Sequence, residues 1–269
     1  MKIGAKILAY NQETYIAYCI KALYPDIDSI VVMYSDVPWT KYNPNARKEF
    51  SQIDRTWEIL TNFPDPMKKL RIIRGRWDIQ EDMRNEAVDT LESMNMDYVL
   101  IVDADEFYPD GTLAKLRRYI EDNDKFLDRK VMWAGRINHF RRFDWIIDPA
   151  NEGPDSIEIA FKTRQNIHFT DRRIVGAPRI DLPSEFYFHH FGYVLDDKRM
   201  WEKIRTWGHA PDVIPDWFEE KYVNWNPQKT SLCKRIPGRW NRAIKFDIRL
   251  LPSILKEHPY FLQCLREPQ

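Results

Sequence analysis

The first 120 residues alternate short apolar runs with segments of helical periodicity, and this order constrains the fold more than any other feature. Strands are expected at 3–10, 29–34, 70–74 and 98–102, where the runs are apolar and rich in β-branched residues. Helices are expected at 13–23, 78–94 and 112–120, where apolar residues recur every three or four positions. Strands separated by helices pair in parallel through crossover connections. The chain is therefore predicted to be an α/β protein with a mostly parallel sheet flanked by helices.

Polar residues follow several of these strands directly. In parallel sheets, ligands bind beyond the carboxyl ends of the strands. This rule brings Tyr10 and Asn11, Asp36, Arg76 and the run 103–106 to one rim of the sheet. The convergence of four separate segments predicts a binding site at this rim.

The most informative segment is the apolar strand 98–102, which runs into Asp103, Asp105 and Glu106. Carboxylates this close repel one another and raise each other's pKa unless a cation joins them. A hard divalent ion with oxygen ligands, Mg²⁺ or Mn²⁺, removes that cost and keeps positions open for phosphate oxygens. The alternative is a solvated acidic turn that caps the next helix at Thr112.

Composition limits the partners and the cellular compartment to be expected. Lys and Arg number 41, as do Asp and Glu, so net charge gives no general argument for a nucleic-acid or membrane partner. Three cysteines lie far apart without metal-ligand spacing, which favours a reducing compartment. Neither a signal peptide nor an apolar run long enough for a transmembrane segment is apparent, so a cytoplasmic protein is expected.

Five segments, taken in order, resemble the GT-A (Rossmann-like) glycosyltransferases, and family 2 most of all. The resemblance covers residues 1–205, which are expected to form the nucleotide-sugar-binding and catalytic domain. Residues 206–269 are expected to form a mainly helical, basic and aromatic-rich extension or lid. The matching segments are 9–13 at the end of the first strand, 31–36 in the second, 84–87 before the acidic strand, 103–106 as the Asp-x-Asp motif, and 190–193 as a His-x-Gly-Tyr segment.

This resemblance implies a metal-dependent enzyme that transfers a sugar from a nucleotide-diphosphate sugar, with a UDP-sugar favoured, to an acceptor hydroxyl on a glycan or lipid-linked saccharide. The implied cofactor is Mn²⁺ or Mg²⁺. Because neighbouring side chains on a strand point to opposite faces, only one of His189 and His190 should face the site, and the resemblance implies His190. The residues implied are Tyr10, Asn11, Asp36, Arg84 and Asp103 for the donor, and Asp103, Asp105 and His190 for the metal.

A catalytic base is harder to choose from the sequence. Inverting enzymes need a carboxylate that deprotonates the acceptor hydroxyl, and we favour Asp181 because it precedes the His segment. Glu106 is a second catalytic candidate, although we expect it to support the loop. A retaining mechanism would need no such base. By position, the other carboxylates that qualify are Asp144, Asp148, Glu158 and Glu185.

Other functions stay open at this stage. The segment 229–249 holds seven basic residues against one acidic residue, and Arg239, Arg242 and Lys245 are predicted to form a helical ridge. Such a ridge suits phosphate-bearing partners, so a hydroxylated base in DNA is an alternative acceptor. A nucleotidyltransferase and a non-catalytic sugar-binding module are further alternatives.

Overall fold

The computed structural model describes residues 1–41, 43–50, 53–151, 155–170, 173–206 and 210–266. Within these ranges one mixed sheet of eleven strands runs in the order β13-β7-β6-β8-β4-β1-β2-β3. Strands β11 and β12 pair with β6, and β5 pairs with β12. A separate hairpin consists of β9 (His168–Thr170) and β10 (Arg173–Val175).

The N-terminal half of the sheet is parallel, as predicted. Its strands are β1 (Ile3–Ala9), β2 (Ser29–Ser35), β3 (Leu70–Gly75) and β4 (Tyr98–Asp103). The register sets Leu8 opposite Asp103, and Ala9 opposite Tyr34. The carboxyl ends of β1, β2 and β4 therefore finish level with one another, at one rim.

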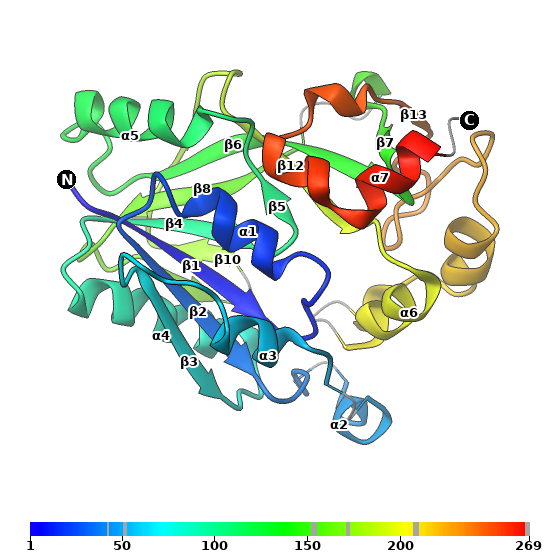
Figure 1. Ribbon diagram of the computed structural model, residues 1–269, viewed down its shortest axis with the longest axis horizontal. Helices are drawn as coiled ribbons and strands as arrows, with labels where there is room; N and C mark the ends of the chain where they lie inside the picture. The colour runs from blue at the N-terminus through cyan, green and yellow to red at the C-terminus, as the bar shows by residue number, and fades with distance from the viewer. Residues whose placement is uncertain (42, 51–52, 152–154, 171–172, 207–209, 267–269) are drawn as a thin grey trace.

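Helices cover both faces of this half, which explains why its strands are apolar on both sides. In Figure 1, α1 and α3 lie in front of the sheet and α4 lies behind it. Alternate residues of β1 join the core on the α1 side, whereas Leu8 joins the core on the α4 side. The helices are α1 (Ile16–Leu23), α2 (Ala46–Glu49), α3 (Thr56–Thr61), α4 (Gln80–Ser93) and α5 (Thr112–Asn123).

The other half of the sheet is mixed. The segments 131–143 and 157–169 are each divided between two strands, because Arg141, Arg164 and Asn166 adopt positive φ, which breaks an extended strand. Strand β6 is antiparallel to β7 and β8 and parallel to β11 and β12. The strands are β5 (Glu106–Phe107), β6 (Val131–Phe140), β7 (Arg142–Ile147), β8 (Ser156–Lys162), β11 (Arg179–Asp181) and β12 (Tyr187–Tyr193).

The C-terminal part folds back onto the sheet. Strand β13 (Ala243–Lys245) pairs antiparallel with β7, so the predicted helical ridge of Arg239, Arg242 and Lys245 is wrong. Trp217, Tyr222 and Trp240 form a third core cluster with residues of β6 and β12. The helical elements are the α-helices α6 (Asp197–Thr206) and α7 (Pro259–Arg266), the π-helix η3 (Phe218–Val223), and the 3-10 turns η1 (Pro149–Asn151), η2 (Ala210–Asp212), η4 (Ile248–Leu250) and η5 (Ser253–Glu257).

None of the helices in the described ranges is both long and apolar enough to cross a membrane.

Candidate functional site

The site lies where β4 turns into β5. Strand β5 pairs antiparallel with β12, and this pairing sets Glu106 opposite His190. The backbone N–H of Phe191 also donates to the Asp105 carbonyl at 2.8 Å. The acidic segment and the His segment, more than 80 residues apart, are thereby held side by side.

Asp105 is the buried anion of this site. Its side chain is 7% exposed, and the Lys203 ammonium of α6 donates to its Oδ2 at 2.6 Å. His190 Nε2 lies 3.8 Å from the other carboxylate oxygen. Burial alone would raise the pKa of Asp105, but Lys203 and His190 outweigh it and lower that pKa to about 2. Asp105 is therefore ionised at neutral pH.

His190 is oriented by a chain of polar side chains. Asn138 Nδ2 donates to Asp155 at 2.5 Å, so the Asn138 oxygen is left to accept a hydrogen bond from His190 Nδ1 at 2.7 Å. Arg136 in turn donates to Asp155 at 3.0 Å. Burial lowers the pKa of His190 to about 4, so its ring is neutral at pH 7. With the proton on Nδ1, the Nε2 lone pair faces Asp105, which is the arrangement of a metal-binding histidine.

Gly192 keeps this side of His190 open. A Cβ at position 192 would collide with the His190 imidazole and lie 3.3 Å from Asp105 Oδ2. Glycine at this position of the His-x-Gly-Tyr segment therefore leaves space beside the imidazole and the carboxylate that any larger residue would fill.

Asp103 and Glu106 have different surroundings from Asp105. The Asp103 side chain is 44% exposed, and its Oδ1 lies 3.8 Å from Arg84 Nη2. Glu106 is buried and accepts a hydrogen bond from the Asp103 backbone N–H at 2.9 Å. Burial and the nearby Asp103 carboxylate raise the pKa of Glu106. Glu106 thus supports the turn, and its hydrogen bond commits it to the backbone.

A divalent cation fits this site only in part. Asp105 supplies an ionised oxygen ligand and His190 a correctly oriented nitrogen, the ligand types that Mn²⁺ accepts. Among the described residues, however, no three His, Cys, Asp or Glu side chains converge closely enough to hold an ion. Asp103, Asp105 and His190 are therefore not assembled as the predicted triad. The Lys203 ammonium pairs with Asp105 Oδ2, whereas His190 faces Oδ1, so an ion held by Asp105 and His190 would lie close to that ammonium and be opposed by its charge.

Comparison with known proteins places the acidic segment within a known family model. The sequence model of Glycosyl transferase family 2 matches residues 49–177, a stretch that contains Arg84, Asp103, Asp105 and Glu106. Residues 49–177 of the chain are thus similar to Glycosyl transferase family 2. The match is shorter than the resemblance over 1–205 that the motifs predict.

Two solved structures similar to this chain are of S. aureus TarS. The structure of TarS 1–349 superimposes with a TM-score of 0.45 at 15% identity, over 71% of this chain and 61% of that chain. The second has a TM-score of 0.40 at 14% identity, over 76% of this chain and 38% of that chain. The chain therefore spans less than two thirds of the length of either structure. No curated protein matches it significantly.

The residues predicted for the nucleotide at the ends of β1 and β2 are each engaged in protein contacts. Tyr10 OH donates to the Phe50 carbonyl at 3.0 Å, and Asn11 accepts from the Asp54 backbone at 3.2 Å. Asp36 is paired with Arg74 at 2.9 Å. These contacts order the loops that follow β1 and β2.

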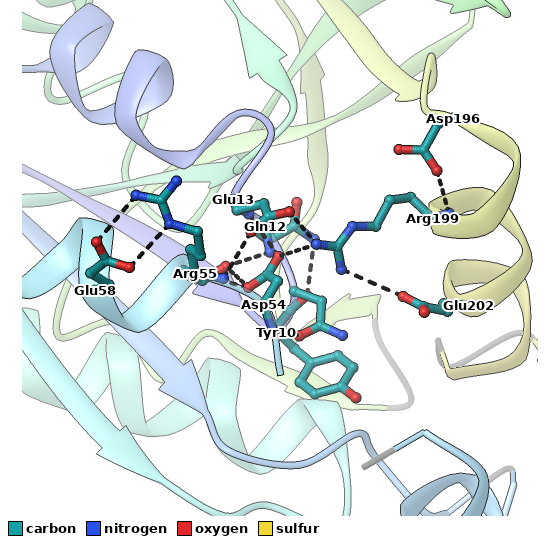
Figure 2. Close-up of polar contacts among 11 residues, drawn as sticks. Tyr10, Gln12, Glu13, Asp54, Arg55, Glu58, Asp196, Arg199 and Glu202 are labelled. Atoms are coloured by element: carbon teal, nitrogen blue, oxygen red, sulfur yellow. Dashed lines mark hydrogen bonds and ion pairs between the residues drawn. The ribbon is translucent and has the colours of Figure 1, made fainter. Parts of the chain in front are cut away.

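Helix α6 is fastened over the same rim. Figure 2 shows Arg199 between Glu13 and Asp54 on one side and Glu202 on the other. The Arg199 guanidinium donates to Glu13, and lies 3.7 Å from Asp54 and 3.5 Å from Glu202. Since Lys203 lies one turn further along α6, the helix that carries the Asp105 partner is itself anchored to the end of β1.

Asp181, the predicted base, does not lie with the other site residues. It sits in β11 at the edge of the sheet, is exposed, and pairs with Arg179 two residues away. Strands β6 and β8 separate β11 from β4, a lateral distance of about 14 Å at ordinary strand spacing.

The other carboxylates considered as the catalytic base differ in their surroundings. Asp144 pairs with Arg142 and Lys245, Asp148 pairs with Arg242, and Glu185 is exposed. Only Glu158, among these described candidates, interacts electrostatically with Arg84 and Asp103, and burial raises its pKa.

Sequence reasoning missed Lys6 and Lys203. Lys6 lies in β1, fully buried, and its ammonium is 5.0 Å from the Phe169 ring with no hydrogen-bond partner among the described residues. Burial and Arg84 lower its pKa to about 7. For Lys6, the sequence did contain a signal, which is a lysine inside an otherwise apolar strand. Lys203 gave no such signal, because its role depends on how α6 folds back.

Proposed function

We propose that this protein is a glycosyltransferase that uses a nucleotide-diphosphate sugar and a divalent cation, and that Asp105 and His190 bind the cation. The observation that carries the proposal is the hydrogen bond from His190 Nδ1 to Asn138, because it leaves the His190 Nε2 lone pair facing an ionised Asp105. A bound Mn²⁺ or Mg²⁺ would act as a Lewis acid toward the leaving diphosphate.

The chain's own residues would then divide the remaining tasks. Arg84 stacks on Phe169 at 5.2 Å and faces Asp103, a position that suits an anionic diphosphate. Asp103, with its 44% exposed carboxylate, is the group we propose for the ribose or the cation. Tyr10, Asn11 and Asp36 are proposed to shape the nucleotide pocket through the loops that they order.

We propose Glu158 in place of Asp181 as the base, should the reaction invert. Burial raises the pKa of Glu158, and a carboxylate with a raised pKa is a stronger base toward the proton of the acceptor hydroxyl. Glu158 also faces Arg84 and Asp103, whereas Asp181 is paired at the sheet edge.

The acceptor proposed is a saccharide hydroxyl. A nucleic-acid acceptor is less well supported, because basic residues of 229–249 are paired with acidic residues: Arg235 with Asp212, Arg242 with Asp148, Lys245 with Asp144 and Arg249 with Asp247. The three cysteines are free thiols, in keeping with a cytoplasmic location.

The test is release of nucleoside diphosphate from a panel of UDP-, GDP- and dTDP-sugars, with Mn²⁺ or with EDTA. We expect one donor, with UDP-sugars first in the panel, to be consumed only with the metal. Consumption of a sugar-1-phosphate with a nucleoside triphosphate, and not of any nucleotide sugar, would instead identify a nucleotidyltransferase.

A further inference from the structure

A cavity of about 570 Å³ lies between the start of β7, the residues that follow β12, the 225–227 loop and α7. It does not include Asp103, Asp105 or His190. Val194, in its wall, follows His190 by four residues, so their Cα atoms are within about 14 Å of each other. The cavity is therefore separate from the cation site yet close enough for one extended ligand to reach both.

Two aromatic rings in the cavity wall are held in place by packing. Trp225 contacts Trp145 edge-on, with ring centroids 5.2 Å apart, and Tyr260 contacts Phe143 edge-on at 6.2 Å. The backbone between them is also fixed, since Tyr15 OH donates to the Val194 carbonyl at 2.5 Å. Rigid aromatic rings provide apolar surface at low entropic cost, which suits the C–H faces of a sugar ring.

The charges of the cavity are balanced and already paired. Arg141 donates to Asp197 at 2.6 Å, and Arg142 donates to Asp144 at 2.9 Å. Asp196 accepts from a backbone N–H of α6 at 2.8 Å. A ligand therefore meets polar groups without a net charge, unlike at the cation site.

We propose that this cavity binds an uncharged saccharide, and that this saccharide is the acceptor of glycosyl transfer. The second half of the proposal rests on the proposed function. Aromatic walls and balanced charges favour a neutral polyhydroxyl ligand over a phosphate-bearing one.

Binding is tested first without any donor. Saturation-transfer NMR would be recorded with cellotriose, chitotriose and mannotriose, with trigalacturonic acid as the charged comparison. We expect at least one neutral trisaccharide to bind, with a Kd of about 1 mM. Failure of every neutral trisaccharide, or stronger binding of the charged one, overturns the proposal. UDP binding, measured separately, keeps this outcome distinct from failure of the proposed function.

A matched pair of variants locates the site. Gln263 and Leu262 are adjacent exposed residues of α7, and only Gln263 lines the cavity. Gln263→Trp should fill the cavity and weaken trisaccharide binding by about tenfold, whereas Leu262→Trp should leave it unchanged. Unchanged binding in Gln263→Trp places the saccharide elsewhere and overturns the assignment.

The acceptor role is tested with the trisaccharide that binds. Gln263→Trp should raise its KM in the transfer reaction by about tenfold while hydrolysis of the donor by water stays at the wild-type rate. An unchanged acceptor KM, with binding in the cavity lost, would refute the acceptor role.

Discussion

Replacing Lys203 with Met removes the cation that contacts Asp105 and nearly preserves the length of the side chain. The wild-type pair is 2.6 Å long, and the Asp105 and Lys203 side chains are 7% and 22% exposed. Removing one partner of a buried pair costs about 3–5 kcal/mol, because the other charge is left uncompensated. Since Lys203 is partly exposed and solvent screens it, we expect the lower end, about 3 kcal/mol.

The predicted loss is measurable by thermal unfolding. For a chain of this size, 1 kcal/mol shifts Tm by about 2 °C, so Lys203→Met should unfold about 6 °C below wild type in EDTA. Mn²⁺ at 100 times its Kd adds about 2.7 kcal/mol and should restore most of that loss, because the ion takes the place of the ammonium. In wild type the charge of the Lys203 ammonium opposes the ion, so the same Mn²⁺ concentration should raise Tm less.

Lys198→Met is the matched control, because Lys198 is an exposed lysine of the same helix. It should change neither Tm nor the response to Mn²⁺. Equal Mn²⁺ shifts in wild type and Lys203→Met would refute the idea that Lys203 competes with the cation. A wild-type Tm for Lys203→Met in EDTA would refute the estimate of the ion pair.

Three further predictions each concern the replacement of one residue. Arg199→Gln leaves Glu13, Asp54 and Glu202 without their shared cation, so hydrogen exchange by mass spectrometry should be faster in α6 and unchanged in β4. Burial lowers the pKa of His258 from 6.5 to about 4, so the unfolded chain takes up the proton first and stability falls as pH decreases from 6.5 to 4. His258→Gln should reduce that slope by up to about 1.4 kcal/mol per pH unit in urea unfolding, and an unchanged slope would contradict the assignment. Lys6→Met removes a buried ammonium without a hydrogen-bond partner among the described residues, and should raise the free energy of urea unfolding at pH 7 by at least about 1 kcal/mol; a decrease would show that Lys6 stabilises the fold.

The parallel half of the fold was predictable because its signals are local. Strands covered on both faces are apolar throughout, as 98–102 is, and the helices between them have clear periodicity. The mixed half was not predictable in the same way. The break after β6 depends on the positive φ of Arg141, which its residue type does not indicate, and β13 finds its partner β7 about 100 residues away.

The candidate site divides in the same manner. The meeting of the acidic segment with His190 was expected from the order of the motifs, and β5 pairing with β12 provides its physical basis. The contacts of α6 were not expected, since Lys203 and Arg199 reach their partners only through a helix that folds back over the rim. The positions of Lys203 and Arg199 in the sequence do not indicate that α6 folds back in this way.

The central claim, a cation-dependent donor site at Asp105, is tested most directly by calorimetric titration of UDP and UDP-sugars with Mn²⁺ and then with EDTA. Wild type should bind only with the metal. Asp105→Asn should weaken binding by about 100-fold, or about 2.7 kcal/mol. Asp122→Asn, a change of an exposed carboxylate in α5, should bind as wild type does. Binding that persists equally in EDTA and in folded Asp105→Asn would contradict the claim.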